Sequence, residues 1–182
     1  MLWLLLNPQP QEPPPPRPAA LVQLQASGQV QLVRSGEKAT VSMEVPVPPE
    51  RAWAVLTDYT RTFAAMPDVK SVSLVSRQGE NLRLRQVLKA PYTFGLSITA
   101  LLEGKEDFKT RTLRYRLVQG ERISALSGDW TLTPAAGGTR IVHTIRLQPE
   151  VPPLLLPSFR SLHDAGLREN FKTLRQLMLA PS

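Results

Sequence analysis

The stretch PSFRSLHDAGLRENFKTLRQLM, residues 157–178, decides the fold of this chain. Its apolar side chains recur at the spacing of one helix face, while charged side chains occupy the opposite face. The apolar face holds His163, Leu167, Phe171, Leu174 and Met178. This predicted helix is the last element and follows a long run of strand patterns. A single closing helix covers one face of a sheet, so the space between them is either packed core or a pocket.

Strand patterns fill most of the chain before this helix. Apolar and polar residues alternate, or turn signals bound short apolar runs, in the segments 21–26, 30–34, 39–47, 81–88, 93–102, 113–117, 130–133 and 140–147. A period of two indicates a sheet with one apolar and one solvated face. Glycines fall between the later segments and no long helix interrupts them. We therefore expect an antiparallel sheet joined by hairpins.

Two short helices are expected after the first long strand. Pro48 and Pro49 end that strand and suit the first turn of a helix over 48–59. A second helix over 60–66 ends before Pro67. Asp58, at the junction, is expected to cap or orient the turn rather than to act as a general base.

The composition is that of one globular domain with a tail. The chain has 182 residues, no Cys, a formal net charge of +7 and a pI near 10.2. Residues 1–20 form a proline-rich tail or linker, whose first six residues are too few to span a bilayer. We expect the folded domain over 21–182. The absence of Cys excludes disulfides and thiolate chemistry and suits the cytoplasm, with peripheral membrane association as the alternative.

Catalytic motifs are not found in the sequence. His143 and His163 lack metal-ligand spacing, and there is no nucleophile elbow and no glycine-rich phosphate loop. We therefore assign no catalytic residue, no metal ligand and no cofactor, and expect a binding protein rather than an enzyme. Both histidines share a face with apolar neighbours and should point inward. They are either hydrogen-bonded core residues or polar handles in an apolar cavity.

Three segments resemble the START-like (SRPBCC) superfamily, which includes polyketide cyclase/dehydrase and coenzyme Q-binding proteins. They are PPERAWAVLTDY at 48–59, the segment Met66-Pro67-Asp68-Val69, and GERISALSGDWTLTPAAGGTRIVHTIRL at 120–147. The resemblance covers roughly residues 36–179. It implies an α+β helix-grip fold, in which a curved antiparallel β-sheet wraps around the long C-terminal α-helix. It also implies a cavity between sheet and helix.

That cavity would bind or transport a hydrophobic small molecule such as a quinone, an isoprenoid or a lipid. The residues expected to bind the ligand are Phe63, Met66, Leu84, Phe94, Ile98, Tyr115, His143, Phe159, Leu162, His163 and Gly166. Plain core packing is the alternative for each. In the terminal helix, we expect the second half to anchor the helix and the first half to flank the ligand. Asp164 and Arg168 are spaced to pair on its solvated face.

Two other functions remain open from the sequence. One is an aromatase/cyclase-like enzyme acting on a polyketide-type substrate, with His143, Tyr115 or His163 moving protons. The other is an interaction module that meets the ribosome, RNA or an anionic membrane through a basic sheet face. The arginines expected on that outer face are Arg83, Arg85, Arg114, Arg116, Arg140 and Arg146.

Overall fold

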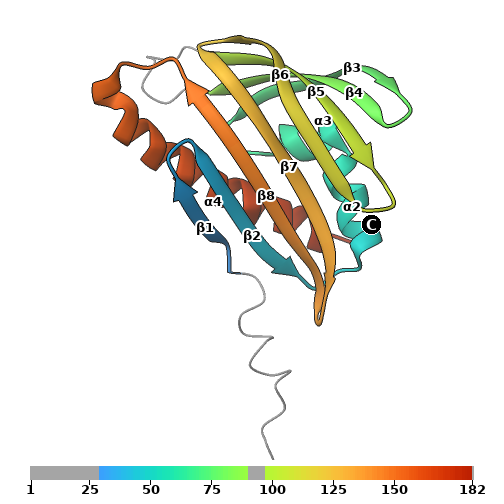
Figure 1. Cartoon of the computed structure of the whole chain (residues 1–182). Helices are drawn as coiled ribbons and strands as arrows, with labels where there is room; N and C mark the ends of the chain where they lie inside the picture. Colours follow the sequence, from blue (N-terminus) through green and yellow to red (C-terminus); the bar gives the residue numbers. More distant parts are fainter. Residues whose placement is uncertain (1–28, 90–96, 182) are drawn as a thin grey trace, which may run out of the picture.

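The computed structural model describes residues 29–89 and 97–181, which form one antiparallel eight-stranded sheet and a long helix in its concave face (Figure 1). The strand order is β1-β2-β8-β7-β6-β5-β4-β3. The strands are β1 (Gln31–Ser35), β2 (Lys38–Val45), β3 (Val69–Gln78), β4 (Asn81–Lys89), β5 (Ser97–Asp107), β6 (Thr112–Glu121), β7 (Ile123–Ala135) and β8 (Gly138–Pro149). The helices are α2 (Pro49–Thr57), α3 (Tyr59–Ala64), a 3-10 turn η1 (Pro153–Leu155) and α4 (Leu156–Leu179). The predicted helix-grip architecture is confirmed.

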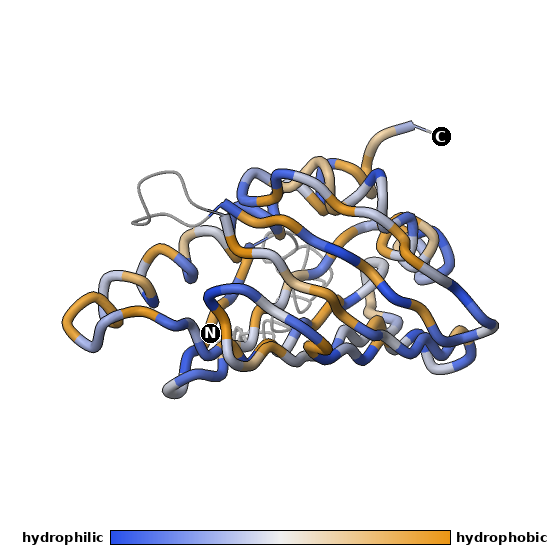
Figure 2. The backbone as a smooth tube through the Cα atoms, turned by 90° about the horizontal axis from the view of Figure 1, so that it is seen from above, coloured by the Kyte–Doolittle hydropathy of each residue, from blue (hydrophilic) through white to orange (hydrophobic). Residues whose placement is uncertain are grey.

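Alternation along the strands produces the two faces of the sheet. In β4, Leu82 and Leu84 are buried against the helix side, whereas Arg83 and Arg85 are exposed. Figure 2 shows the same switching of hydropathy along successive strands. The six arginines predicted to point outward are all exposed in the structure. The apolar face is therefore the one that the helices cover.

Strand β3 was not predicted from the sequence. It lies at the edge of the described sheet, where its partner is β4, and most of its residues are exposed. Two register shifts, between Val69 and Ser71 and between Leu74 and Ser76, break the period of two. A bulged, solvated edge strand has too little buried surface to impose a regular apolar pattern.

The two short helices meet at Asp58. The Asp58 carboxylate accepts a hydrogen bond from the backbone N–H of Arg61 (3.4 Å) and so caps α3, as expected for this residue. The boundary differs from the prediction by a few residues, because Tyr59 opens α3 instead of closing α2. Trp53, inside α2, is buried in the core.

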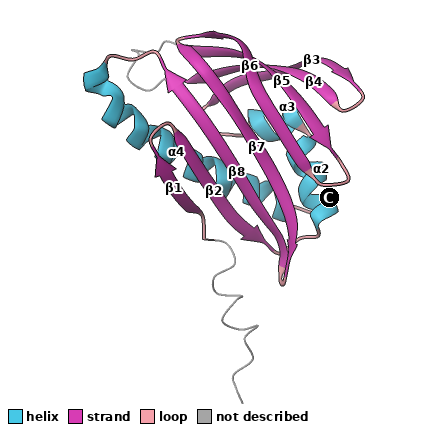
Figure 3. Cartoon of the chain, viewed as in Figure 1, coloured by secondary structure: helices cyan, strands magenta, loops and turns pink. Residues whose placement is uncertain are grey.

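Helix α4 crosses the concave face of the sheet, as Figures 1 and 3 show. The inner face of its second half is fully buried: Phe171 is 1% exposed, and Leu174 and Met178 are 0% exposed. The helix contacts β1, β2 and α2. The expectation that this half anchors the helix agrees with its burial.

The C-terminal end of α4 is held by Arg51 from α2. The Arg51 guanidinium donates hydrogen bonds to the backbone oxygens of Met178 (Nε to O, 2.8 Å) and Ala180. These carbonyls carry the negative end of the helix dipole, and α4 has no basic residue in its own last turn. We expect Arg51→Ala to lower the free energy of unfolding by about 1 to 2 kcal/mol. Urea unfolding would measure the loss, and Arg168→Ala, at an exposed position of the same helix, should change it little.

Several predictions fall outside the described residues. They are the 1–20 tail, the strand over 21–26, the start of the domain at residue 21 and the placement of Phe94. In residues 29–89 and 97–181, no helix is both long and apolar enough to cross a membrane.

Candidate functional site

A pocket of about 180 Å³ lies between the first half of α4 and the inner face of the sheet. Its lining is mainly apolar. Ten predicted ligand residues line it, namely Phe63, Met66, Leu84, Ile98, Tyr115, His143, Phe159, Leu162, His163 and Gly166. Strands β4, β5, β6 and β8, helix α3, the turn after it and α4 therefore bring these residues together. Their role in binding a ligand remains a prediction.

Tyr115 and His143 form a hydrogen-bonded polar pair in the sheet wall, which also holds the buried side chain of Gln86. The Tyr115 hydroxyl and His143 Nε2 lie 2.9 Å apart and share a hydrogen bond. The imidazole stacks on the Trp130 ring, with centroids 3.8 Å apart and planes 5° apart. Trp130 in turn stacks on Phe171 of α4. The pair is thus fixed between the sheet and the anchored half of the helix. His143 Nδ1 is buried and has no partner among the described residues.

Gly128 makes this pairing possible. It sits opposite Tyr115 in the β6–β7 register, with Ile145 on its other side in β8. A Cβ atom at this position would lie 2.5 Å from the Tyr115 hydroxyl oxygen and would overlap the backbone oxygen of Thr144. The tyrosine ring therefore crosses β7 over a residue that has no side chain and reaches His143 on the next strand.

Burial keeps both residues of this pair neutral. Desolvation lowers the pKa of His143 to about 3, and the nearby His163 acts in the same direction. The pKa of the Tyr115 hydroxyl is raised, first by burial and then by the charge of Asp129. At neutral pH the pocket therefore presents an uncharged imidazole and an uncharged phenol.

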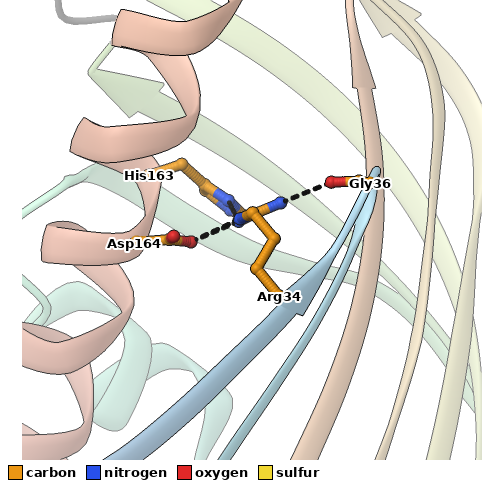
Figure 4. Close-up of polar contacts among 4 residues, drawn as sticks. All are labelled: Arg34, Gly36, His163 and Asp164. Atoms are coloured by element: carbon orange, nitrogen blue, oxygen red, sulfur yellow. Dashed lines mark hydrogen bonds and ion pairs between the residues drawn. The ribbon is translucent and has the colours of Figure 1, made fainter.

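A second polar cluster lies at the first half of α4 and meets the pocket through His163 (Figure 4). Arg34 of β1 donates from Nε to Asp164 Oδ1 (2.7 Å) and from Nη2 to His163 Nδ1 (2.7 Å). Because a guanidinium can only donate, Nδ1 accepts, and the neutral imidazole carries its proton on Nε2. Burial lowers the pKa of His163 to about 4, with Arg34 as the second cause. The predicted Asp164–Arg168 pair is replaced by this longer-range contact, because Asp164 is turned toward β1.

Asp68 and Asn170 were not predicted as part of the site. Both line the pocket, and Asn170 Nδ2 donates to Asp68 Oδ2 (3.1 Å). Burial raises the pKa of Asp68, while the hydrogen bond from Asn170 opposes that shift. A sequence signal was available, because Asn170 lies one turn beyond Gly166 on the helix, and Asp68 lies in the segment that resembles the START-like proteins.

Gly166 leaves space between α4 and Asp68. A Cβ atom added there would meet only Asp68 Oδ2, at 3.5 Å, which is an ordinary contact. Close packing on the sheet therefore does not require this glycine. We expect Gly166→Ala to raise the free energy of unfolding by about 0.5 to 1 kcal/mol, because alanine favours the helix. Thermal unfolding would measure the change, and a loss of stability would show that the backbone needs glycine here.

The fold and the pocket together define a START-like protein. The chain belongs to the family described as polyketide cyclase / dehydrase and lipid transport, whose model matches residues 37–178. No curated protein sequence matches the chain significantly.

Solved structures show the same fold. The protein TTHA0849 from Thermus thermophilus is 26% identical, with a TM-score of 0.62 over 78% of this chain and 92% of that one. The Zhui aromatase/cyclase from Streptomyces sp. R1128 is 17% identical, with a TM-score of 0.60 over 83% and 92%. A STAR-related lipid transfer protein fragment from Xanthomonas axonopodis is 15% identical, with a TM-score of 0.63 over 83% and 99%. The last two similarities concern the fold alone.

Proposed function

We propose that this protein binds and carries a hydrophobic small molecule in the pocket beneath the first half of α4. The observation that carries the proposal is the pocket itself, a mainly apolar space between sheet and helix whose polar groups include Tyr115 with His143, His163, and Asp68 with Asn170. Burying one methylene contributes about 0.8 kcal/mol, so a ligand can bind there with few polar contacts. The family description, which includes lipid transport, supports the same function.

The pocket volume limits the ligand. An apolar cavity of about 150 Å³ accepts benzene, and the pocket here measures about 180 Å³. A single ring or a short acyl chain fits that space. We therefore favour a compact ligand, such as a quinone ring, with any long isoprenoid tail outside the pocket. A carbonyl or hydroxyl group on it would find hydrogen-bonding partners in Tyr115 and His163.

A cyclase-type reaction is the second candidate. The Tyr115–His143 hydrogen bond, inside an apolar pocket, is the observation that favours it. However, an efficient general base has a pKa near the working pH, and the pKa of His143 is about 3. We therefore rank binding above catalysis. Replacing both residues in Tyr115→Phe/His143→Phe should abolish a reaction but leave the binding of an apolar probe within a few-fold.

Filling the pocket tests the proposed function. Gly166→Leu adds a side chain to a position that lines the pocket, and we expect at least tenfold weaker binding of a single-ring quinone such as methyl-1,4-benzoquinone, measured by isothermal titration calorimetry. Ala165→Leu makes the same kind of change at the neighbouring, exposed position and should leave the affinity unchanged. Equal binding by both variants, with unfolding curves that show both are folded, would contradict a ligand site here.

A further inference from the structure

The outer face of the sheet has a hollow of its own. A recess of about 600 Å³ lies over β3, β4, β5 and β6, and the charged residues that line it alternate with residues buried on the inner face. Its polar lining consists of Ser76, Gln78, Asn81, Arg83, Glu103, Lys105, Arg114 and Arg116. Four cations and one carboxylate thus line one cavity. The proposed function does not involve these side chains, although some of the strands that carry them also form the inner pocket.

The strand register brings two cations to one carboxylate. Arg83 of β4 is opposite Glu103 of β5, which is opposite Arg116 of β6. Glu103 forms ion pairs with both arginines, at 4.0 Å to Arg83 and in closer contact with Arg116. One negative charge is therefore shared between two positive charges. This row of three residues across the strands has a net charge of +1.

The next row places like charges directly opposite each other. Lys105 of β5 pairs in register with Arg114 of β6, and like charges at such positions destabilise a sheet. Lys105 has a distant partner in Glu80, at 4.0 Å. Arg114 forms no ion pair within residues 29–89 and 97–181, although Asp129 is its neighbour in β7. Each of these two cations thus has a carboxylate nearby, but their own opposition is a local cost, which is expected where a sequence serves binding.

We propose that the recess binds the sugar-phosphate backbone of a single-stranded nucleic acid. Arginine and lysine are the usual phosphate donors, and the amides of Gln78 and Asn81 at the rim can also donate to phosphate oxygens. A recess accommodates a strand better than a flat bilayer does. Among the described residues, none of the exposed large apolar side chains lines it, so the recess itself offers no such side chain to insert into lipid. Tyr115 is the one aromatic residue in the described lining, and its hydroxyl is bonded to His143 on the inner side of the sheet, so binding should depend little on base sequence.

Fluorescence anisotropy with labelled oligouridylate of about ten nucleotides tests this proposal. With about three net positive charges engaged, the logarithm of the association constant should fall against the logarithm of salt concentration with a slope near −2. Arg114→Thr should weaken binding several-fold and reduce the slope by about 0.7. It should change the melting temperature little, because it removes both the repulsion from Lys105 and the attraction to Asp129. Glu103→Gln removes the shared carboxylate and should tighten binding several-fold.

Matched variants separate the recess from general surface charge. Arg140→Thr removes one arginine from the same face, outside the recess, where Arg140 pairs with Glu44 (3.6 Å), and should change oligonucleotide binding less than twofold. An equal loss in Arg114→Thr and Arg140→Thr would overturn the proposal. So would salt-sensitive binding to phosphatidylcholine–phosphatidylserine vesicles without binding to the oligonucleotide, or no binding to either. Gly166→Leu should bind the oligonucleotide like the native protein, which makes this result independent of the pocket.

Discussion

Lowering the pH from 7 to 4.5 is expected to remove about 2 to 3 kcal/mol of folding stability through His143 alone. The folded pKa of about 3 lies well below the ordinary value of 6.5. Between those values the unfolded chain binds more protons than the folded chain, so the stabilisation is complete above pH 6.5 and is lost as the pH falls toward 3. His163, with a folded pKa of about 4, acts in the same direction. Asp68, whose pKa is raised, acts in the opposite one. Urea unfolding at the two pH values measures the sum.

The double variant Tyr115→Phe/His143→Phe isolates the His143 contribution. At pH 7, replacing both partners of a hydrogen bond by apolar groups of similar shape costs little, whereas each single change leaves a buried polar group without its partner and costs about 1 to 3 kcal/mol. The double variant should therefore be close to the native protein at pH 7 and more stable than it at pH 4.5. If the double variant loses as much stability in acid as the native protein, His143 is not the cause.

Gly128→Ala is expected to cost about 3 kcal/mol of stability. The added Cβ would overlap the backbone oxygen of Thr144 and lie 2.5 Å from the Tyr115 hydroxyl. Relief requires that β7 and β8 separate locally and that Tyr115 leave His143, so the variant should lose both packing and the polar pair. Thermal and urea unfolding measure the loss.

Two further variants test whether steric overlap causes that loss of stability. Gly137→Ala lies in open space, with nothing within 4 Å of the new Cβ, and should stay within about 0.5 kcal/mol of the native protein. Combining Gly128→Ala with Tyr115→Leu removes the clash with the ring but not the one with Thr144, so it should recover part of the stability. Full recovery would mean that the backbone contact is unimportant.

The sequence predicted well those strands and helices that have one buried face. Alternation in β4 and β8 and the apolar stripe of α4 are consequences of packing against one core, so they are visible in the residues themselves. Strand β3 lacks that constraint, because it is a bulged edge strand and mostly exposed. It was therefore missed.

The sequence predicted ten of the residues that line the candidate site but not their contacts. The alternation along a strand and the apolar stripe of a helix identify inward-facing residues such as Ile98, His143 and Gly166. The predicted ligand residues that the structure describes do line the pocket. The direction in which a residue faces cannot show that Arg34 contacts His163, because β1 and α4 are far apart in the sequence. The small volume of the pocket depends on side-chain packing in three dimensions, which no pattern along the chain encodes.

The strand order has a consequence for how the chain folds. Strands β3 to β8 pair with their sequence neighbours, so hairpins can form them one after another at small entropic cost. Strand β2 pairs instead with β8, and partners such as Lys38 and Arg146 are separated by most of the domain. Closing that long loop costs chain entropy, and this cost is offset only when the sheet is complete. The joining of β2 to β8 should therefore be the slow step of folding, and α4, which packs against β1 and β2, can dock in its final position only after it.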